Sequence, residues 1–287
     1  MRIVTFLHHN QPSLGIMHGQ VVMPVPGLSM LGLITAGQDT LADLNALHRT
    51  AVPLADAQLL APIPNPRRNI FCVGLNYAEH AKESAEAYGR EAKLPKVPVF
   101  FTKATNTVNG PHSDIPFDPA VSTQIDWEAE LGVVIGRRGK NISQAGAMNY
   151  VFGYLVINDV SARDLQSAHS QFFKGKSLDG ACPMGPWILT ADEVPDPHAL
   201  GIRCRVNGAI KQEAVTSQMI FKIPALIESL SLGMTLEPGD VIATGTPSGV
   251  GFARTPPEFL KPGDVVECEV DGVGLIRNRV SLPVQHH

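Results

Sequence analysis

The chain has 287 residues, of which 44% are hydrophobic and 17% are charged, as is typical of a soluble globular protein with a full core. Its formal net charge of −4 and its pI near 6.2 argue against nucleic acid or an anionic membrane surface as the main partner. No apolar stretch approaches the roughly 20 residues that a membrane span needs, and the N-terminus lacks a signal-peptide pattern. We therefore expect a cytoplasmic protein.

Residues 1–65 are predicted to form a small N-terminal α/β domain. Its expected strands are Ile3–Leu7, Leu14–His18 and Gln20–Val25, and a helix is expected around Thr40–Arg49. Residues 61–67 contain three prolines within five positions, which disfavours both a helix and a central strand. We interpret this stretch as a linker to a larger domain over residues 66–287.

The second domain is predicted to be rich in β-structure. Its expected strands are Ile70–Val73, Val99–Thr102, Glu128–Ile135, Gly153–Asn158, Trp187–Thr190, Leu200–Val206, Val241–Thr244, Val265–Val270 and Leu275–Val280. The dipeptides Asn207-Gly208 and Asp271-Gly272 have the composition of two-residue hairpin turns. Because the strands do not alternate with long helices, an α+β, β-rich fold is expected and a doubly wound parallel sheet is not.

One clear helix is predicted at Met219–Ser231. Ser217 is a suitable N-cap and Gly233 a suitable C-terminal stop, although Pro224 lies inside the predicted range.

Two glutamates on one predicted strand are the first candidates for a functional site. Glu128 and Glu130 are two residues apart, so on a strand they share a face and lie roughly 6–7 Å apart. Two like charges that face the interior are costly unless something neutralises them. With Asp159, at the end of another predicted strand, they could hold Mg²⁺ or Mn²⁺ and leave positions for substrate. The alternative is an edge strand on which both glutamates face solvent.

A short polar helix is predicted after the strand Ile70–Val73. His80 and Glu83 are three residues apart and share a face of this helix, so the carboxylate could orient the imidazole as a general base. The helix has no apolar stripe, and weakly packed polar segments make natural lids. The alternative is a solvated surface helix without a function.

Two loops offer further candidates. Lys176 lies in a loop rich in Gly and Pro, where it could balance negative charge on a substrate, whereas Lys174 is interpreted as a surface residue. The loop Thr244–Gly251 could present backbone N–H groups to an anion, although a plain tight turn is the alternative. The four cysteines fit free thiols in a reducing compartment, and Cys182 is interpreted as a packed small side chain and not as a nucleophile.

Together these segments resemble the fumarylacetoacetate hydrolase family. The motifs that carry the resemblance, in the family's order over about residues 68–280, are Phe71–His80, Asp126–Leu131, Ile157–Gln166, Gly175–Asp179, Cys182–Pro186 and Thr244–Gly251. The resemblance implies a mixed β-roll catalytic domain, a homodimer, and Mg²⁺ or Mn²⁺ in the site, with Ca²⁺ possible in crystals.

The resemblance also assigns roles to single residues. Those implied to bind the metal are Glu128, Glu130 and Asp159. Those implied to act in catalysis are His80, Glu83 and Lys176. Those implied to contact substrate are Tyr77, Lys103, Arg163, Gln166, Gly245 and Thr246.

The family's chemistry implies a small 2-oxo or 2,4-dioxo acid as substrate. The main expectation is a hydrolase that cleaves a C–C bond of an acylpyruvate or a diketo-deoxy sugar acid through a metal-bound enolate, with His80 activating water. The alternative is a decarboxylase or isomerase of oxaloacetate-type or 2-hydroxy-diene-dioate-type acids on the same site. A non-catalytic binding protein would be expected to have lost a metal carboxylate or His80, and this chain has both.

Overall fold

The computed structural model describes residues 1–37, 40, 44 and 50–282. The strands are β1 (Arg2–His8), β2 (Gln11–His18), β3 (Val21–Val25), β4 (Val52–Pro53), β5 (Gln58–Leu59), β6 (Ile70–Gly74), β7 (Val99–Lys103), β8 (Val108–Asn109), β9 (Ile115–Pro116), β10 (Ile125–Asp126), β11 (Ala129–Ile135), β12 (Val151–Asn158), β13 (Ser161–Ala162), β14 (Cys182–Thr190), β15 (Gly201–Val206), β16 (Ala209–Val215), β17 (Val241–Ala243), β18 (Val265–Val270) and β19 (Gly274–Ser281).

The helices are short. The α-helices are α1 (Met30–Ala36), α3 (Ala78–Ala87), α4 (Gln144–Ala147), α5 (Arg163–Ala168), α6 (Phe173–Lys176) and α7 (Ile223–Ser231). The 3₁₀ helices are η1 (Leu54–Asp56), η2 (Thr105–Thr107), η3 (Met148–Tyr150), η4 (Ala191–Glu193), η5 (Thr216–Gln218) and η6 (Gly251–Ala253). Among the described residues, no helix is long and apolar enough to cross a membrane.

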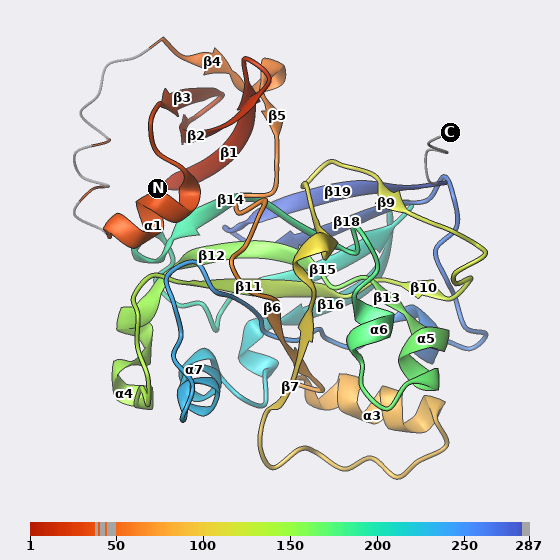
Figure 1. Cartoon of the computed structure of the whole chain (residues 1–287). Coiled ribbons are helices and arrows are strands. Elements are labelled where there is room, and N and C mark those ends of the chain that lie inside the picture. Colours follow the sequence, from red (N-terminus) through yellow and green to blue (C-terminus); the bar gives the residue numbers. More distant parts are fainter. Residues whose placement is uncertain (38–39, 41–43, 45–49, 283–287) are drawn as a thin grey trace.

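A large mixed sheet forms the centre of the molecule (Figure 1). Its order is β4-β3-β2-β1-β14-β12-β11-β17-β6-β7, with β5 paired to β1 and β8 paired to β14. A second sheet has the order β16-β15-β18-β19-β9. Neighbours are antiparallel except for β17 with β6, β14 with β8 and β19 with β9. The β-rich α+β expectation is confirmed.

The two middle strands of this sheet are completely buried. All residues of β11 and all residues of β12 lie in the core. The second sheet packs against one face, and side chains of the other face share an apolar cluster with helix α1 and Ile63. Such strands need apolar side chains on both faces. A polar residue within or at the end of these strands is therefore the exception that requires a physical reason.

The N-terminal segment continues the central sheet. Strand β1 pairs antiparallel with β14, with Ile3 opposite Ile188, and Figure 1 shows β1–β5 extending from that edge. Leu14 and Leu33 share one apolar cluster with core residues of the larger part. The segment is therefore joined to the larger part of the chain by hydrogen bonds and by a common core, and the domain boundary at residue 65 stays a prediction.

Several helices differ from the sequence expectation. Helices α4 and α5 were not predicted, and Lys176, expected in a loop, is the last residue of α6. Helix α7 begins at Ile223 and not at Met219, because Pro224 lacks an N–H and is suited to the first turn. Helix α1 was not predicted, although Ser29 caps it by accepting a hydrogen bond from Gly32 N at 3.1 Å. The helix expected around Thr40–Arg49 lies largely outside the described residues.

The two hairpin dipeptides lead to different loops. Asn207 and Gly208 form a two-residue turn, since Val206 pairs with Ala209 and both turn residues have positive φ. The second turn has three residues and not two, because Val270 pairs with Gly274. A three-residue loop with glycine at positive φ is a common alternative for this composition.

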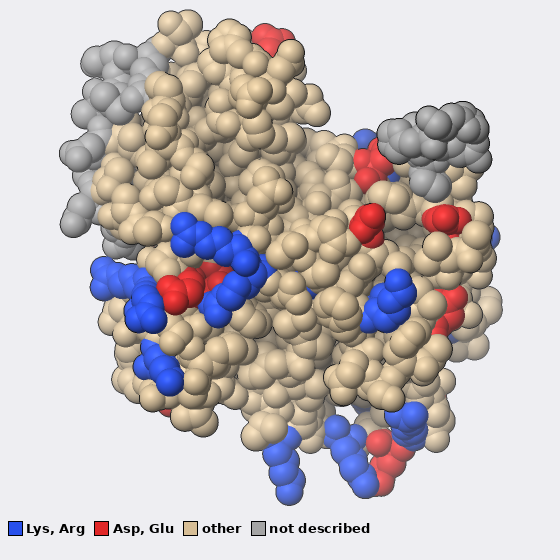
Figure 2. Space-filling model, viewed as in Figure 1, with Lys and Arg blue, Asp and Glu red and all other residues tan. Residues whose placement is uncertain are grey.

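Figure 1 shows α3, α5 and α6 gathered on one side of the sheet, opposite the N-terminal strands. On the face seen in Figure 2, Lys and Arg lie in small groups, several of them beside Asp or Glu, on a mostly uncharged surface. The three helices enclose the site described next.

Candidate metal centre and active site

Neighbouring strands bring the three predicted carboxylates together. Glu130 lies on β11 opposite Ile157 of β12, and Asp159 follows the end of β12. Glu128 directly precedes β11, and its carbonyl accepts a hydrogen bond from Asp159 N at 2.9 Å. Antiparallel pairing therefore places the start of one strand beside the end of the next, although Asp159 is distant from Glu128 in sequence.

The three carboxylates form a compact buried cluster. Glu128, Glu130 and Asp159 each offer an oxygen within 4.8 Å of the others, and they are 5%, 1% and 0% exposed. Strand β11 lies between β12 and β17, so the alternative in which both glutamates face solvent from an edge strand is wrong. Like charges at this depth require positive charge nearby.

The protonation of the two glutamates differs because their neighbours differ. Burial raises the pKa of Glu130 well above its ordinary value, and the charges of Asp159 and Glu128 add to the rise. Burial also acts to raise the pKa of Glu128, but the cations Lys176 and Arg163 outweigh it and hold that pKa at about 2. Of the two glutamates, Glu130 is therefore the one whose charged form is disfavoured by its surroundings.

This donor set fits Mg²⁺ or Mn²⁺. The cluster offers only carboxylate oxygens, the donors that hard divalent cations prefer, and contains none of the Cys or His ligands typical of zinc. A cation there would remove the like-charge repulsion that acts on Glu130. Glu128, Glu130 and Asp159 are the residues that would hold it.

Two buried lysines neutralise part of this charge. Lys176 Nζ donates to Glu128 Oε2 and to Asp159 Oδ2, each at 2.8 Å. Lys103 Nζ donates to Asp159 Oδ1 at 2.7 Å and to the Val160 carbonyl at 2.9 Å. Although burial acts to lower the pKa of Lys176, the two carboxylates raise it above its ordinary value, so its ammonium stays charged.

Lys103, Lys174 and Lys176 differ in the solvent exposure of their side chains. Lys176 is 2% exposed and Lys103 is 0% exposed, whereas Lys174 is exposed, as the sequence analysis expected. Lys103 was expected to contact substrate; its ammonium binds Asp159 and it is not among the described residues that line the pocket, so its direct contact with substrate stays a prediction.

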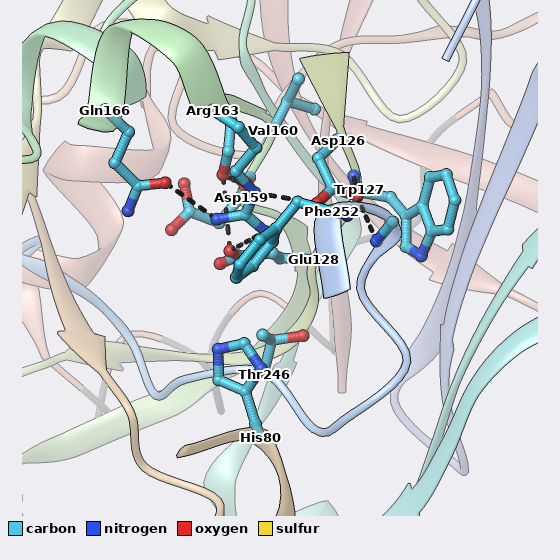
Figure 3. A network of polar contacts seen from close by, with 12 residues as sticks. His80, Asp126, Trp127, Glu128, Asp159, Val160, Arg163, Gln166, Thr246 and Phe252 are labelled. Carbon is cyan, nitrogen blue, oxygen red and sulfur yellow. Dashed lines mark hydrogen bonds and ion pairs between the residues drawn. The ribbon is translucent and has the colours of Figure 1, made fainter. Parts of the chain in front are cut away.

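Arg163 joins the cluster to the pocket (Figure 3). Its Nη2 lies 2.7 Å from Glu128 Oε1, and its Nη1 donates to Gln166 Oε1 at 2.9 Å. Its Nε donates to Asp126 Oδ2 at 2.8 Å, and its guanidinium lies 4.4 Å from the centre of the Phe252 ring. These four contacts fix the position of the guanidinium, which forms part of the pocket wall.

A small pocket lies against the carboxylate cluster. It is lined by Val73, Gly74, Leu75, His80, Ser84, Tyr88, Phe101, Glu128, Arg163, Gln166, Phe172, Lys176, Thr246 and Phe252. Five of the predicted catalytic and substrate residues are therefore brought together here. They are His80, Arg163, Gln166, Lys176 and Thr246.

Tyr77 and Gly245 lie behind the pocket. Tyr77 is 2% exposed, its hydroxyl has no hydrogen-bond partner among the described residues, and burial raises its pKa together with the charge of Glu130. Gly245 N donates to Glu130 Oε2 at 2.7 Å. Neither residue is among the described residues that line the pocket, so their direct contact with substrate stays a prediction.

Helix α3 covers the pocket with the predicted dyad. His80 is 6% exposed, and its Nδ1 lies 2.9 Å from Glu83 Oε1. In Figure 3 the imidazole lies beside Thr246 and faces the group formed by Glu128 and Arg163. His80 is therefore buried against the pocket although much of the outer face of the helix is exposed, and the ordering of the helix on ligand binding stays a prediction.

Comparison with known proteins decides the family. The family model described as "Fumarylacetoacetate (FAA) hydrolase C-terminal" matches residues 69–281, and the model "Rv2993c-like, N-terminal" matches residues 1–62. The chain belongs to the fumarylacetoacetate hydrolase family. Its fold is the β-rich fold of that family with an Rv2993c-like N-terminal domain.

Three family members illustrate the range of similarity. Oxaloacetate tautomerase YisK of Bacillus subtilis is 49% identical over 227 residues, which cover 79% of this chain and 74% of that protein. The fumarylacetoacetate hydrolase of Exiguobacterium antarcticum has a TM-score of 0.86 at 40% identity, covering 99% and 100% of the two chains. A maleylpyruvate hydrolase of Sphingobium sp. SYK-6, solved with manganese(II) and pyruvate, has a TM-score of 0.79 at 30% identity, covering 99% and 100%.

In this family member the loop Thr244–Gly251 binds the protein's own carboxylates. Gly245 N donates to Glu130, and Gly251 N donates to Asp126 Oδ1 at 2.7 Å. These N–H groups already bind carboxylates of the chain itself, so binding of a substrate anion by the loop stays a prediction.

Sequence reasoning did not assign roles to Asp126 and Gln212. Asp126 is fully buried and holds Arg163, and its place in the same motif as Glu128 was a signal that could have found it. Gln212 bridges Ala129 N and Thr246 Oγ1, at 2.9 and 2.8 Å, and no sequence pattern marks it.

Cys182 is a packed side chain of the core, as the sequence analysis expected. The thiol is fully buried, and burial raises its pKa to about 12. It therefore stays protonated at neutral pH and is unsuited to nucleophilic attack.

Proposed function

We propose that this protein is a divalent-metal-dependent keto–enol tautomerase of oxaloacetate or a closely related 2-oxo acid. The observation that carries the proposal is the position of His80. Its ring faces the pocket beside the carboxylate cluster, and its Nδ1 is hydrogen-bonded to Glu83. The 49% identity to an oxaloacetate tautomerase supports the same reaction. The isomerase alternative is therefore preferred over the hydrolase that was the main expectation.

Tautomerisation moves one proton and breaks no bond between carbons. The C3–H bond of the keto acid breaks, its electron pair forms the C2–C3 double bond, and the C2 oxygen gains a proton. The reaction requires a base near C3, a proton donor near the C2 oxygen and positive charge for the developing oxyanion. It requires no attacking water.

The residues of the pocket can meet these requirements. His80 has its second ring nitrogen available to take the C3 proton and return it to oxygen, while Glu83 stabilises the imidazolium that forms in between. Lys176 supplies a permanent positive charge at the base of the pocket. Bound Mg²⁺ or Mn²⁺ would supply Lewis-acid stabilisation of the oxyanion.

The phenylalanines that line the pocket have a different role from its charged residues. Phe101, Phe172 and Phe252 line the pocket, and apolar side chains exclude water from the space where charge develops. Exclusion of water favours tautomerisation over hydrolysis, because hydrolysis needs a water molecule beside the substrate.

The test compares three reactions on one preparation. Enol-oxaloacetate is mixed with the protein and Mg²⁺ or Mn²⁺, and decay of the enol absorbance is followed, with chelator as the control. Pyruvate is measured in parallel from oxaloacetate, for decarboxylation, and from an acylpyruvate, for hydrolysis. Fast metal-dependent loss of the enol without pyruvate supports the proposal, whereas pyruvate release as the faster reaction contradicts it.

A C–C bond hydrolase is the second candidate. The same His80–Glu83 pair could deprotonate water, and the similar maleylpyruvate hydrolase was solved with pyruvate. His80→Ala should then reduce acylpyruvate cleavage by about 10²–10⁴-fold. Lys174→Ala, which changes an exposed residue of the neighbouring helix α6, is the matched control.

A further inference from the structure

The carboxylate of Glu83 has two partners that come from different parts of the chain. Its Oε1 lies 2.9 Å from His80 Nδ1. The backbone N–H of Gly249 donates to both oxygens, at 3.1 Å to Oε1 and 2.9 Å to Oε2. One side chain of α3 therefore both orients the imidazole and attaches the helix to the loop after β17.

The peptides on both sides of the one that binds Glu83 are held in place by residues outside α3. The carbonyl of Gly249 accepts a hydrogen bond from Trp127 Nε1 at 3.2 Å. Trp127 is 1% exposed and immediately precedes the metal-cluster residue Glu128. Two residues earlier, Pro247 O accepts a hydrogen bond from Gln212 Nε2 at 2.8 Å. Trp127, next to the carboxylate cluster, and Gln212 of β16 thus set the position of the segment that presents the Gly249 N–H.

Only glycine fits at position 249. Its φ is +103°, a conformation that residues with a side chain rarely adopt, and an added Cβ would collide with the carbonyl oxygen of Lys211. Any side chain there must shift the backbone, and with it the N–H that binds Glu83.

We infer that Gly249 is a positioning residue that acts through Glu83 on His80. Its N–H fixes the carboxylate, and the carboxylate fixes the ring over the pocket, so that docking of α3 and assembly of the dyad are one event. The inference rests on the proposed role of His80 in proton transfer. A hydrogen bond to a charged group is typically worth a factor of about 10–100, which is the expected size of the effect.

Gly249→Ala tests this inference on the full-length protein. Hydrogen exchange of the α3 amides should become about 10–100-fold faster, and the hydrogen-bonded Nδ1–H signal of His80 in NMR spectra should be lost. In the tautomerase assay kcat should fall by a similar factor with little change in KM. Gly263→Ala is the matched control, because Gly263 also has a positive φ, of +97°, but an added Cβ there meets nothing within 4 Å.

A double-mutant cycle separates action through Glu83 from a general structural defect. In a Glu83→Ala background, Gly249→Ala should cause no further loss, because the partner is already gone. Glu83→Gln keeps an acceptor for the Gly249 N–H and should preserve the protection of α3 while kcat falls.

Two outcomes would overturn the inference: losses that multiply in the double mutant, or a Gly249→Ala protein that behaves like the Gly263→Ala control. If Gly249→Ala does not fold, Trp127→Phe removes the support of the Gly249 carbonyl and is placed in the same cycle. Hydrogen exchange and NMR do not depend on substrate, so they decide the inference even if the tautomerase assay shows no activity.

Discussion

Lys103→Met is the sharpest test of how the charge cluster is held. Lys103 is 0% exposed and donates to Asp159 Oδ1 at 2.7 Å. Methionine keeps most of the side-chain volume but removes the ammonium, so Asp159 keeps only the hydrogen bond of Lys176 on its other oxygen. Removing one partner of a buried ion pair costs about 3–5 kcal/mol. The free energy of unfolding of the metal-free protein should fall by about that amount.

The measurement is urea unfolding in chelator, with Lys174→Met as the control. Lys174 is exposed on helix α6, and a substitution there should change the unfolding free energy by no more than about 0.5 kcal/mol. A contact with substrate would have a different signature. If Lys103→Met unfolds like the wild type while KM rises strongly, Lys103 binds substrate and our account of its role is wrong.

Four further predictions follow from the same geometry. Glu130→Gln should abolish Mg²⁺ or Mn²⁺ binding in calorimetry while circular dichroism stays unchanged; undiminished binding would exclude Glu130 as a ligand. Burial and like charges raise the pKa of Glu130, so a proton on this carboxylate competes with the metal. Metal affinity should therefore fall as pH decreases, and metal binding should release protons. An affinity that does not depend on pH would contradict this. Lys176→Ala should reduce kcat/KM by several orders of magnitude while Lys174→Ala changes it little, and the reverse ranking would refute the assignment. Oxalate with Mg²⁺ should slow hydrogen exchange of helix α3, and equal exchange with and without ligand would argue against a lid that orders over substrate.

The sequence by itself determined most of the strands and the identity of the charged residues. Alternation of side chains along a strand was enough to place Glu128 and Glu130 on one side, and spacing on a helix was enough to pair His80 with Glu83. Both inferences depend on local geometry alone. Local composition also marked the prolines at 61–67 and most of the strands that the structure describes.

Local signals failed where two rules competed. Pro224 was read as a tolerated interruption of a longer helix, whereas its missing N–H makes it a starting residue. The Asp271-Gly272 dipeptide suits both two-residue and three-residue loops, and the pairing of Val270 with Gly274 selects the second.

Only the tertiary structure decided which charges meet. The pairing of β11 with β12 brings Asp159 beside Glu128. Arg163, at the start of α5, lies 2.7 Å from Glu128, and Lys103, at the end of β7, lies 2.7 Å from Asp159. The same holds for the bond between Glu83 and Gly249, which are 166 positions apart. Backbone N–H groups leave no trace in the sequence, because every residue except proline has one. Their direction, and hence the carboxylate that each one binds, is set by the path of the folded chain.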